Sequence, residues 1–202
     1  MESRILSDSE KDGLKEICNI GSSKASSFLT ERTGDTFDMD VPEANIIKSK
    51  EFLNFYTDVT EKFNNPMTLM TTLKGVDGSI IVSSSEENMK YLLSTDKNGT
   101  EFKELVEKNS VEAVKKYLNG LNDFLNLNIE INNSNTSYKY ADMILYQRIK
   151  QLLKGEKDFK NVKLLITITS LYIGNDKMLD IMMVVKLDDV NKITDPLHNM
   201  LT

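Results

Sequence analysis

The sequence has little of the residue chemistry from which metal sites, disulfides and nucleophilic triads are built. Its 202 residues include a single cysteine, a single histidine and no tryptophan. One cysteine excludes an intramolecular disulfide, and no cysteine spacing typical of zinc sites is present. His198 follows Asp195 by three residues near the C-terminus, which is too little for a Ser-His-Asp system, so a surface histidine is expected. We therefore expect no metal site in the chain.

Long apolar runs and clusters of basic residues are also missing. No run approaches about 18 consecutive apolar residues, the length that a membrane-spanning helix requires, so we expect no insertion into a membrane. Residues 1–8 are too polar and acidic for a secretion signal, which predicts a cytoplasmic protein. The formal net charge of −6 argues against binding nucleic acid without sequence preference. With 40% hydrophobic residues, the chain can bury a full core in one domain.

The clearest local pattern is that of an amphipathic helix from about residue 8 to about residue 30. At about 100° per residue, apolar and small residues at positions 14, 17, 18, 21, 25 and 28 gather on one face. Asp12, Glu16, Asn19 and Ser23 gather on the opposite face. Glu16 and Asn19 are therefore predicted to be exposed neighbours.

Two serines precede this helix and are candidates for its N-cap. The hydroxyl of Ser7 or Ser9 can accept a hydrogen bond from a backbone N–H that lacks a partner within the helix. Glu10 follows Ser7 by three residues, as in a capping box. The helix is therefore predicted to open near Asp8.

Asp12, Glu16, Asn19 and Pro42 stand at the spacing D-x-x-x-E-x-x-N-x(22)-P. Residues 12–21 read D-G-L-K-E-I-C-N-I-G, which resembles the D-x-L-K-E-I-G-N-I-G of the CheC/CheX/FliY family, and residues 41–43 read V-P-E as in that family. The chain thus resembles the phosphatases that act on phosphorylated CheY, with one intact active-site motif. The resemblance covers the whole chain but is most specific in residues 7–43.

The resemblance implies roles for Asn19 and Glu16, whereas Asp12 and Pro42 have local explanations. A carboxamide is neutral and carries both donor and acceptor, so Asn19 would orient a water molecule without deprotonating it. Glu16 would pair with a lysine in the active site of a response regulator and set the docking register. Asp12 also favours the helix macrodipole, and Pro42, which has no reactive group, is expected to shape the entry to a strand.

By the same resemblance, the chain would be a hydrolase whose substrate is the aspartyl phosphate of a CheY-like response regulator. Phosphoryl transfer depends mainly on alignment and electrostatics, so one water-orienting side chain from a partner can suffice. The divalent cation, Mg²⁺, would belong to the regulator, and this chain would need no cofactor of its own.

Two residues depart from the family pattern. Cys18 stands where the family has glycine and lies on the apolar face, which favours a buried thiol that packs as a small hydrophobic group over a redox role. Lys24 adds a positive charge near the expected docking face, and the sequence leaves open whether it helps or hinders an acidic partner.

The order helix, strand, hairpin, helix occurs twice, which predicts an α+β fold with two similar halves. The halves are residues 1–98 and 99–202 of one CheC-like domain, in which two long helices pack on a shared, mostly antiparallel sheet. Helices are predicted at about 8–30, 86–94, 100–125, 140–153 and 188–195, and the last is allowed to resume after Pro196. Residues 50–64 are predicted as a short helix or an irregular segment. Strands are predicted at about 36–48, 67–74, 79–84, 127–131, 162–172 and 178–187.

The second long helix lacks an equivalent motif. Residues 117–125 read Y-L-N-G-L-N-D-F-L and resemble the family's run after its second motif. Counting back without gaps places Lys108 at the acid position and Val111 at the amide position, so the second site is degenerate. A shift of one residue offers Glu107 with Ser110, but a hydroxyl lacks the reach of a carboxamide, and Glu107 is expected to be a solvated charge.

Other functions remain open from the sequence. One is a non-catalytic module that acts through a CheD-like deamidase, a known class of partner for CheC proteins. Another is a small-molecule pocket between the halves, lined by Met67, Met70 and Met143, although methionine at such spacing is more often core filling. The sequence leaves open whether the chain is a monomer or a homodimer.

Overall fold

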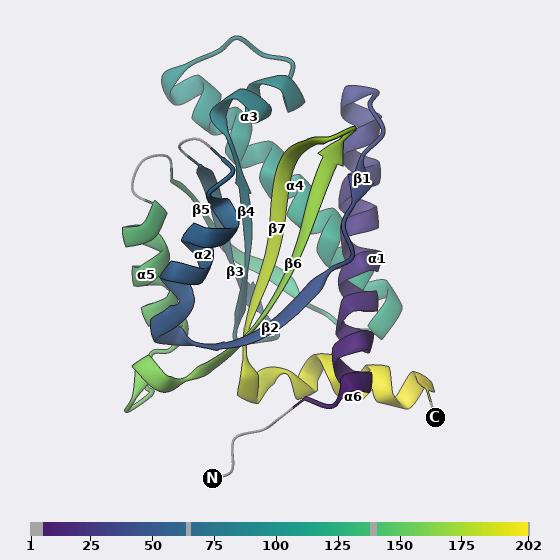
Figure 1. Ribbon diagram of the computed structural model, residues 1–202, viewed down its shortest axis with the longest axis vertical. Coiled ribbons are helices and arrows are strands. Elements are labelled where there is room, and N and C mark those ends of the chain that lie inside the picture. Colours follow the sequence, from purple (N-terminus) through teal and green to yellow (C-terminus); the bar gives the residue numbers. More distant parts are fainter. Residues whose placement is uncertain (1–5, 64–65, 138–140, 202) are drawn as a thin grey trace.

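A computed structural model describes residues 6–63, 66–137 and 141–201, which form a layered α+β structure around one sheet (Figure 1). The helices are α1 (Asp8–Thr33), α2 (Phe52–Thr60), α3 (Glu86–Leu92), α4 (Gly99–Leu125), α5 (Ala141–Leu152) and α6 (Asn191–Leu201). The strands are β1 (Asp38–Met39), β2 (Glu43–Lys48), β3 (Met67–Lys74), β4 (Gly78–Ser84), β5 (Glu130–Ser137), β6 (Lys163–Ile173) and β7 (Asp176–Lys186). Short 3₁₀ turns occupy Ser49–Glu51, Phe159–Asn161 and Leu187–Asp189.

The seven strands follow the order β1-β6-β7-β4-β3-β5, and β2 also pairs with β6. Each of the recorded strand pairings is antiparallel. The hairpins β3–β4 and β6–β7 meet through β4 and β7, with Gly78 opposite Val185 and Ser83 opposite Asp180. The centre of the sheet is therefore built from two segments about a hundred residues apart in the chain.

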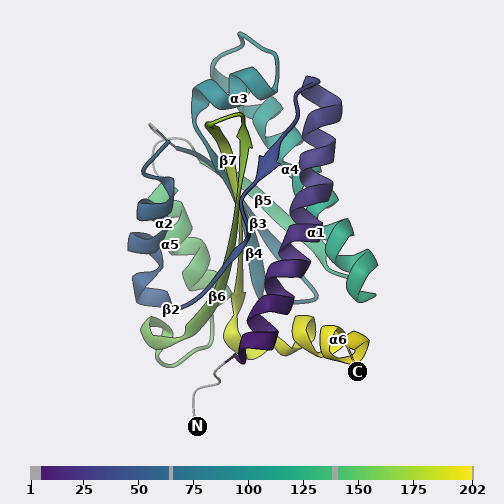
Figure 2. The same ribbon diagram turned by 45° about the vertical axis from the view of Figure 1, so that its right-hand side comes forward.

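Helices cover both faces of the sheet. Figure 2 shows α1 and α4 on one face, and α2 and α5 on the other. Side chains alternate along the strands accordingly: Ile181 and Met183 of β7 join the core beneath α1 and α4, whereas Met182 and Val184 join the core beneath α2 and α5. Successive residues of a strand point to opposite faces, so a strand that is buried on both sides reads as a continuous apolar run.

These features confirm the predicted α+β fold class and the repeated order of elements. The helix predicted to end near residue 30 continues to Thr33, where Gly34 takes a left-handed conformation with φ of 83° and its N–H bonds to the carbonyl of Thr30. The predicted segments at 50–64 and 140–153 together cover the second face of the sheet. That arrangement depends on contacts between distant segments, which the local pattern does not contain.

Three predicted segments differ in the structure. The extended segment at 36–48 is divided into β1 and β2. The strand predicted at 127–131 begins at Glu130 and runs on to Ser137, because this polar edge strand lacks an apolar alternation that reveals its length. The helix predicted at 188–195, with a resumption allowed after Pro196, begins only at Asn191, after a 3₁₀ turn, and runs through Pro196 to Leu201 without a break.

The methionines suggested as pocket lining fill the core instead. Met67 belongs to the core beneath α1 and α4, and Met70 belongs to the core on the opposite face of the sheet. The two side chains therefore cannot line one cavity. The side chains of Met143 and His198 lie outside the described residues.

Candidate functional site

The helix that carries the motif begins at a complete capping box. Ser7 is the N-cap: its Oγ accepts a hydrogen bond from the backbone N–H of Glu10 at 3.2 Å. The carboxylate of Glu10 in turn accepts one from the backbone N–H of Ser7 at 2.8 Å. The structure therefore identifies Ser7, and not Ser9, as the N-cap. These hydrogen bonds fix the residue at which the helix begins.

Close contact between α1 and α4 sets the rotation of α1. A Cβ on Gly21 would lie 2.4 Å from Leu121 Cδ1 and 3.0 Å from the Tyr117 ring, and a Cβ on Gly120 would lie 3.1 Å from Gly21 Cα. Glycine at both positions lets the two helices approach this closely. The glycine of the N-I-G run therefore has a packing role, and it turns Asn19, two residues earlier, away from α4.

Glu16 and Asn19 lie on the side of α1 that faces away from the sheet. Glu16 is exposed and Asn19 is partly buried, whereas Leu14, Ile17 and Cys18 are buried. Within the described residues, neither Glu16 nor Asn19 has a hydrogen-bond or ion-pair partner. A carboxylate and a carboxamide thus remain available, one helical turn apart, for an incoming molecule.

Asp12 lies one turn before Glu16 and is exposed. Its Oδ1 is 3.6 Å from Lys15 Nζ on the same helix. Exposed pairs of this kind contribute about 0 to 1 kcal/mol, so the contact does little more than place a charge near the start of the helix.

Pro42 lies at a break in the edge strand of the sheet. Met39 pairs with Leu171 and Glu43 pairs with Ile168, so three residues of the edge, 40–42, face only two residues of β6. This extra residue is a bulge, and Pro42, which lacks an N–H, is buried there as expected for a shaping residue. Val41 beside it projects outward and is 79% exposed.

The edge strand runs antiparallel along α1 and brings Pro42 level with Asn19. Ser26 Oγ donates to the carbonyl of Phe37 at 3.5 Å, and Lys11 lines one groove with Ile46. From Lys11 to Asn19 the helix rises roughly 12 Å, and from Ile46 to Pro42 a strand spans roughly 13 Å. Pro42 and Val41 therefore lie at the level of Asn19 along α1, and Val41 projects outward there. Sequence reasoning missed Val41, because an apolar residue beside a proline predicts burial as readily as exposure.

The second long helix, α4, carries the residues that the sequence places at the second motif position. Lys108 is exposed, whereas Val111 packs against the core. In the shifted alignment, Ser110 is only 5% exposed, so its hydroxyl cannot reach a partner protein. The sequence predicts a solvated charge at Glu107. In the structure, its Oε1 accepts a hydrogen bond from Ser134 Oγ of β5 at 3.1 Å.

The two departures from the family pattern both have structural roles. Cys18 is buried, as predicted, and its Sγ donates to Thr167 Oγ1 at 3.1 Å. Burial raises the pKa of the Cys18 thiol, so the reactive thiolate is disfavoured. Lys24 is exposed, and its Cγ lies over Gly120 of α4, which places its stem on the side of α1 away from Asn19.

Residues 6–63, 66–137 and 141–201 contain neither a metal cluster nor a membrane-spanning helix. No group of three or more His, Cys, Asp or Glu side chains in these ranges is arranged to hold a metal ion. In the same ranges, no helix has the length and apolar character that crossing a bilayer requires.

Solved structures share this fold. FliY from Thermotoga maritima is 16% identical, with a TM-score of 0.68 over 97% of this chain and 99% of that one. The FliM middle domain from H. pylori is 9% identical, with a TM-score of 0.63 over 95% and 99%. CheX from Borrelia burgdorferi, in a complex with CheY, BeF₃ and Mg²⁺, is 15% identical, with a TM-score of 0.50 over 83% and 96%.

Neither a family model nor a curated protein sequence matches the chain. At these low identities the structural likenesses establish the fold: the protein has the α+β fold of FliY, CheX and the FliM middle domain. The motif on α1 thus occurs on the kind of scaffold that its resemblance implied.

Proposed function

We propose that this protein belongs to the CheC/CheX family and hydrolyses the aspartyl phosphate of a CheY-like response regulator. The observation that carries the proposal is the pair Glu16 and Asn19, one turn apart on the outer side of α1 and without partners in the described residues. A CheX of the same fold has been crystallised with CheY, BeF₃ and Mg²⁺, which supports a regulator of this type as the partner.

In the proposed mechanism, Asn19 aligns the attacking water molecule with the phosphoryl group. Its carbonyl oxygen accepts a hydrogen bond from a water molecule, and this holds the water in line with the phosphorus atom of the regulator. The charge that develops on the phosphoryl oxygens is balanced by the Mg²⁺ and the lysine of the regulator. The amide of Asn19 takes up no proton, so the reaction needs no titratable group of this chain.

Glu16 and Val41 set the docking geometry in this proposal. Glu16 forms an ion pair with the regulator's active-site lysine, and its exposed position leaves its carboxylate free to do so. Val41, at the bulge level with Asn19, offers an apolar contact beside this polar pair. Together they orient the regulator so that the carboxamide enters its active site.

The decisive experiment follows the decay of the regulator's acyl phosphate with the intact protein and with Asn19→Ala. We expect a rate loss of about 10- to 1000-fold, as for other positioning groups, while binding to the regulator is retained. Asn54→Ala is the matched control, because Asn54 is an exposed asparagine on α2, across the sheet. Equal rates for the intact protein and Asn19→Ala would remove the catalytic role.

A second candidate is a binding module without catalysis. Val111, at the second motif position, packs against the core and offers no amide to a partner, which favours a module without catalysis. The occurrence of the fold in a FliM that was crystallised in a complex with FliG favours it as well. The partner of such a module would be a CheD-like deamidase. Tight binding of this deamidase, with no acceleration of phosphate loss from any chemotaxis regulator encoded nearby, favours the module over the phosphatase.

A further inference from the structure

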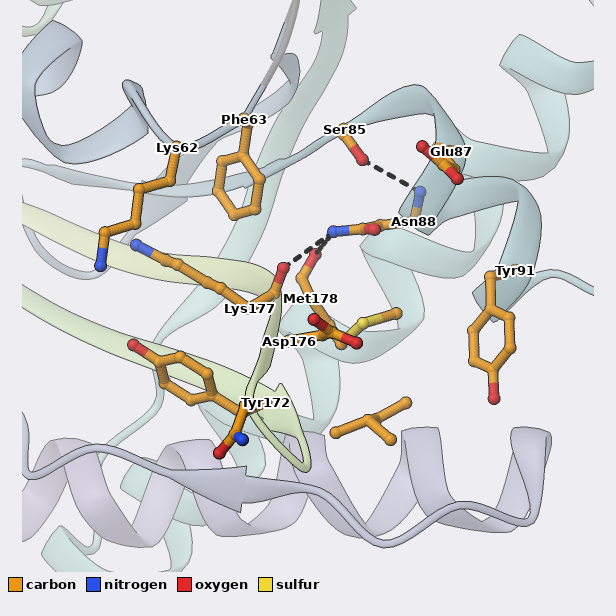
Figure 3. A pocket seen from close by; sticks show the side chains of 12 residues that line it. Lys62, Phe63, Ser85, Glu87, Asn88, Tyr91, Tyr172, Asp176, Lys177 and Met178 are labelled. Atoms are coloured by element: carbon orange, nitrogen blue, oxygen red, sulfur yellow. Dashed lines mark hydrogen bonds between the residues drawn. The ribbon is translucent and has the colours of Figure 1, made fainter.

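A hollow of about 730 Å³ lies at the end of the sheet and includes no residue of α1 (Figure 3). Its walls come from the segment after α2, from the start of α3 and from the tip of the β6–β7 hairpin. Asn88 joins two of these walls, because its Nδ2 donates to the carbonyls of Lys177 at 2.9 Å and Met178 at 3.1 Å. The hollow is therefore preformed by hydrogen-bonded segments and has the size of a small-ligand site.

One side of the hollow carries the side chains of Lys62 and Lys177. Lys177 Nζ lies 2.8 Å from Oδ2 of the buried Asp180 and 5.3 Å from the centre of the Phe63 ring. Ser170 Oγ donates to the other carboxylate oxygen of Asp180 at 2.6 Å. Lys62 is exposed on the same side and has no hydrogen-bond or ion-pair partner within the described residues. Asp180 pairs with Lys177, and the carboxylate of Asp40 accepts a hydrogen bond from Tyr172 OH at 2.7 Å beside them. Lys62 is thus the lysine on this side whose ammonium group is available to an incoming carboxylate.

The opposite side carries negative charge. Figure 3 shows the carboxylates of Glu87 and Asp176 on the side away from the two lysine amines. Both are exposed, and neither forms an ion pair with a described residue. Between the two sides, Phe63 and Met178 provide an apolar floor, since both are buried.

We propose that this hollow binds a short peptide through its free termini, with the α-carboxylate at Lys62 and the α-ammonium at Glu87 and Asp176. The charge arrangement disfavours the simpler alternatives: a polyanion such as a nucleotide is repelled by the two carboxylates, and a simple cation is repelled by Lys62. The volume exceeds that of one free amino acid and accommodates side chains against Phe63. The proposal does not depend on phosphatase activity.

Binding is tested by isothermal titration with the peptide Ala-Phe-Ala in three forms: free, N-acetylated and C-amidated. The intact protein is expected to bind the free form saturably and each blocked form about tenfold more weakly, because a charged contact contributes roughly one factor of ten. Lys62→Met should weaken binding of the free and N-acetylated forms about tenfold and leave the C-amidated form unchanged.

Two further variants complete the design. Glu87→Gln should weaken the free and C-amidated forms and leave the N-acetylated form unchanged, which is the mirror image of Lys62→Met. Lys50→Met is the matched control, because Lys50 is an exposed lysine outside the hollow. The three substituted residues are exposed, so these changes leave the core intact. The proposal is overturned if the free peptide does not bind saturably. It is also overturned if the three forms bind equally well to the intact protein and equally well to Lys62→Met.

Discussion

Cys18 and Asn19 are adjacent in the chain but meet opposite environments. A turn of about 100° between them places the thiol in the core against Thr167 and leaves the amide partly exposed. The thiol lies close to the phenol of Tyr117, which is 1% exposed. The buried thiol thereby fixes the backbone from which the side chain of Asn19 projects, as the proposed water-positioning role requires.

This buried pair predicts a loss of stability in alkali. Burial raises the pKa of Cys18 and raises the pKa of Tyr117 well above its ordinary value. The unfolded chain releases these protons at the ordinary values while the folded chain retains them, so this contribution to stability is complete below about pH 8 and falls as pH rises. The expected slope is about 1.4 kcal/mol per pH unit for each group, measured by urea unfolding.

Variants assign that loss to the two residues. Cys18→Ala with Tyr117→Phe should flatten the decline above about pH 8. Tyr146→Phe, which removes an exposed phenol on α5, should leave the decline as it is. An unchanged slope in the double variant would show that other groups are responsible.

At the scale of elements, α1 is the part of the molecule on which the proposed site depends. The Ser7–Glu10 capping box determines where α1 starts, and Gly21 determines its rotation against α4. The edge strand, with its bulge at Val41 and Pro42, lies beside α1. The bulge is held from the other side as well, because Tyr172 OH donates to Asp40 Oδ2 at 2.7 Å. Helix and edge strand are thus aligned by separate contacts.

The cap yields a prediction that separates two neighbouring serines. Ser7→Ala should lower the free energy of unfolding by about 1 kcal/mol, because the N–H of Glu10 loses its acceptor. Ser9→Ala should change it by less than about 0.5 kcal/mol, since Ser9 is an exposed residue in the first turn. Denaturant unfolding of both variants is the measurement, and equal losses would contradict the role of the capping box.

At the scale of the whole molecule, two contacts join the halves of the chain. β4 pairs with β7 at the centre of the sheet, and α1 crosses α4 with glycine on both sides. The run at 117–125, which resembles the family, has a structural purpose here: Gly120 admits α1, and Asn122 binds both the N–H and the carbonyl of Ile129 at 2.9 and 2.8 Å. The boundary between the halves at residues 98 and 99 stays a prediction.

Gly21→Ala tests the crossing. The new methyl group would meet Leu121 and Tyr117, which are themselves fully packed, and overpacking of this kind costs about 1–3 kcal/mol. The better helix propensity of alanine returns about 1 kcal/mol, so we expect a net loss of about 1 kcal/mol in a single unfolding transition. Ser23→Ala, on the exposed side of α1, is the control without a clash. Unchanged or increased stability of Gly21→Ala would contradict the close crossing.

Local signals in the sequence were enough to determine the motif helix, both hairpins and the α+β class. Ser7 and Glu10 are three residues apart, the apolar period identifies the buried face of α1, and glycine marks the turns of β3–β4 and β6–β7. Each of these signals acts over a few residues, so no knowledge of distant partners is needed.

Only the tertiary structure decided the exposure of Val41, the length of β5, the burial of Ser110 and the hollow near Lys62. Val41 projects because β6 fixes the register on both sides of the bulge, and the polar β5 is a strand because β3 supplies its hydrogen bonds. Lys62 and Glu87 face one cavity because segments far apart in sequence end at the same edge of the sheet. Such positions depend on which surfaces the rest of the chain covers, and a local pattern does not contain that information.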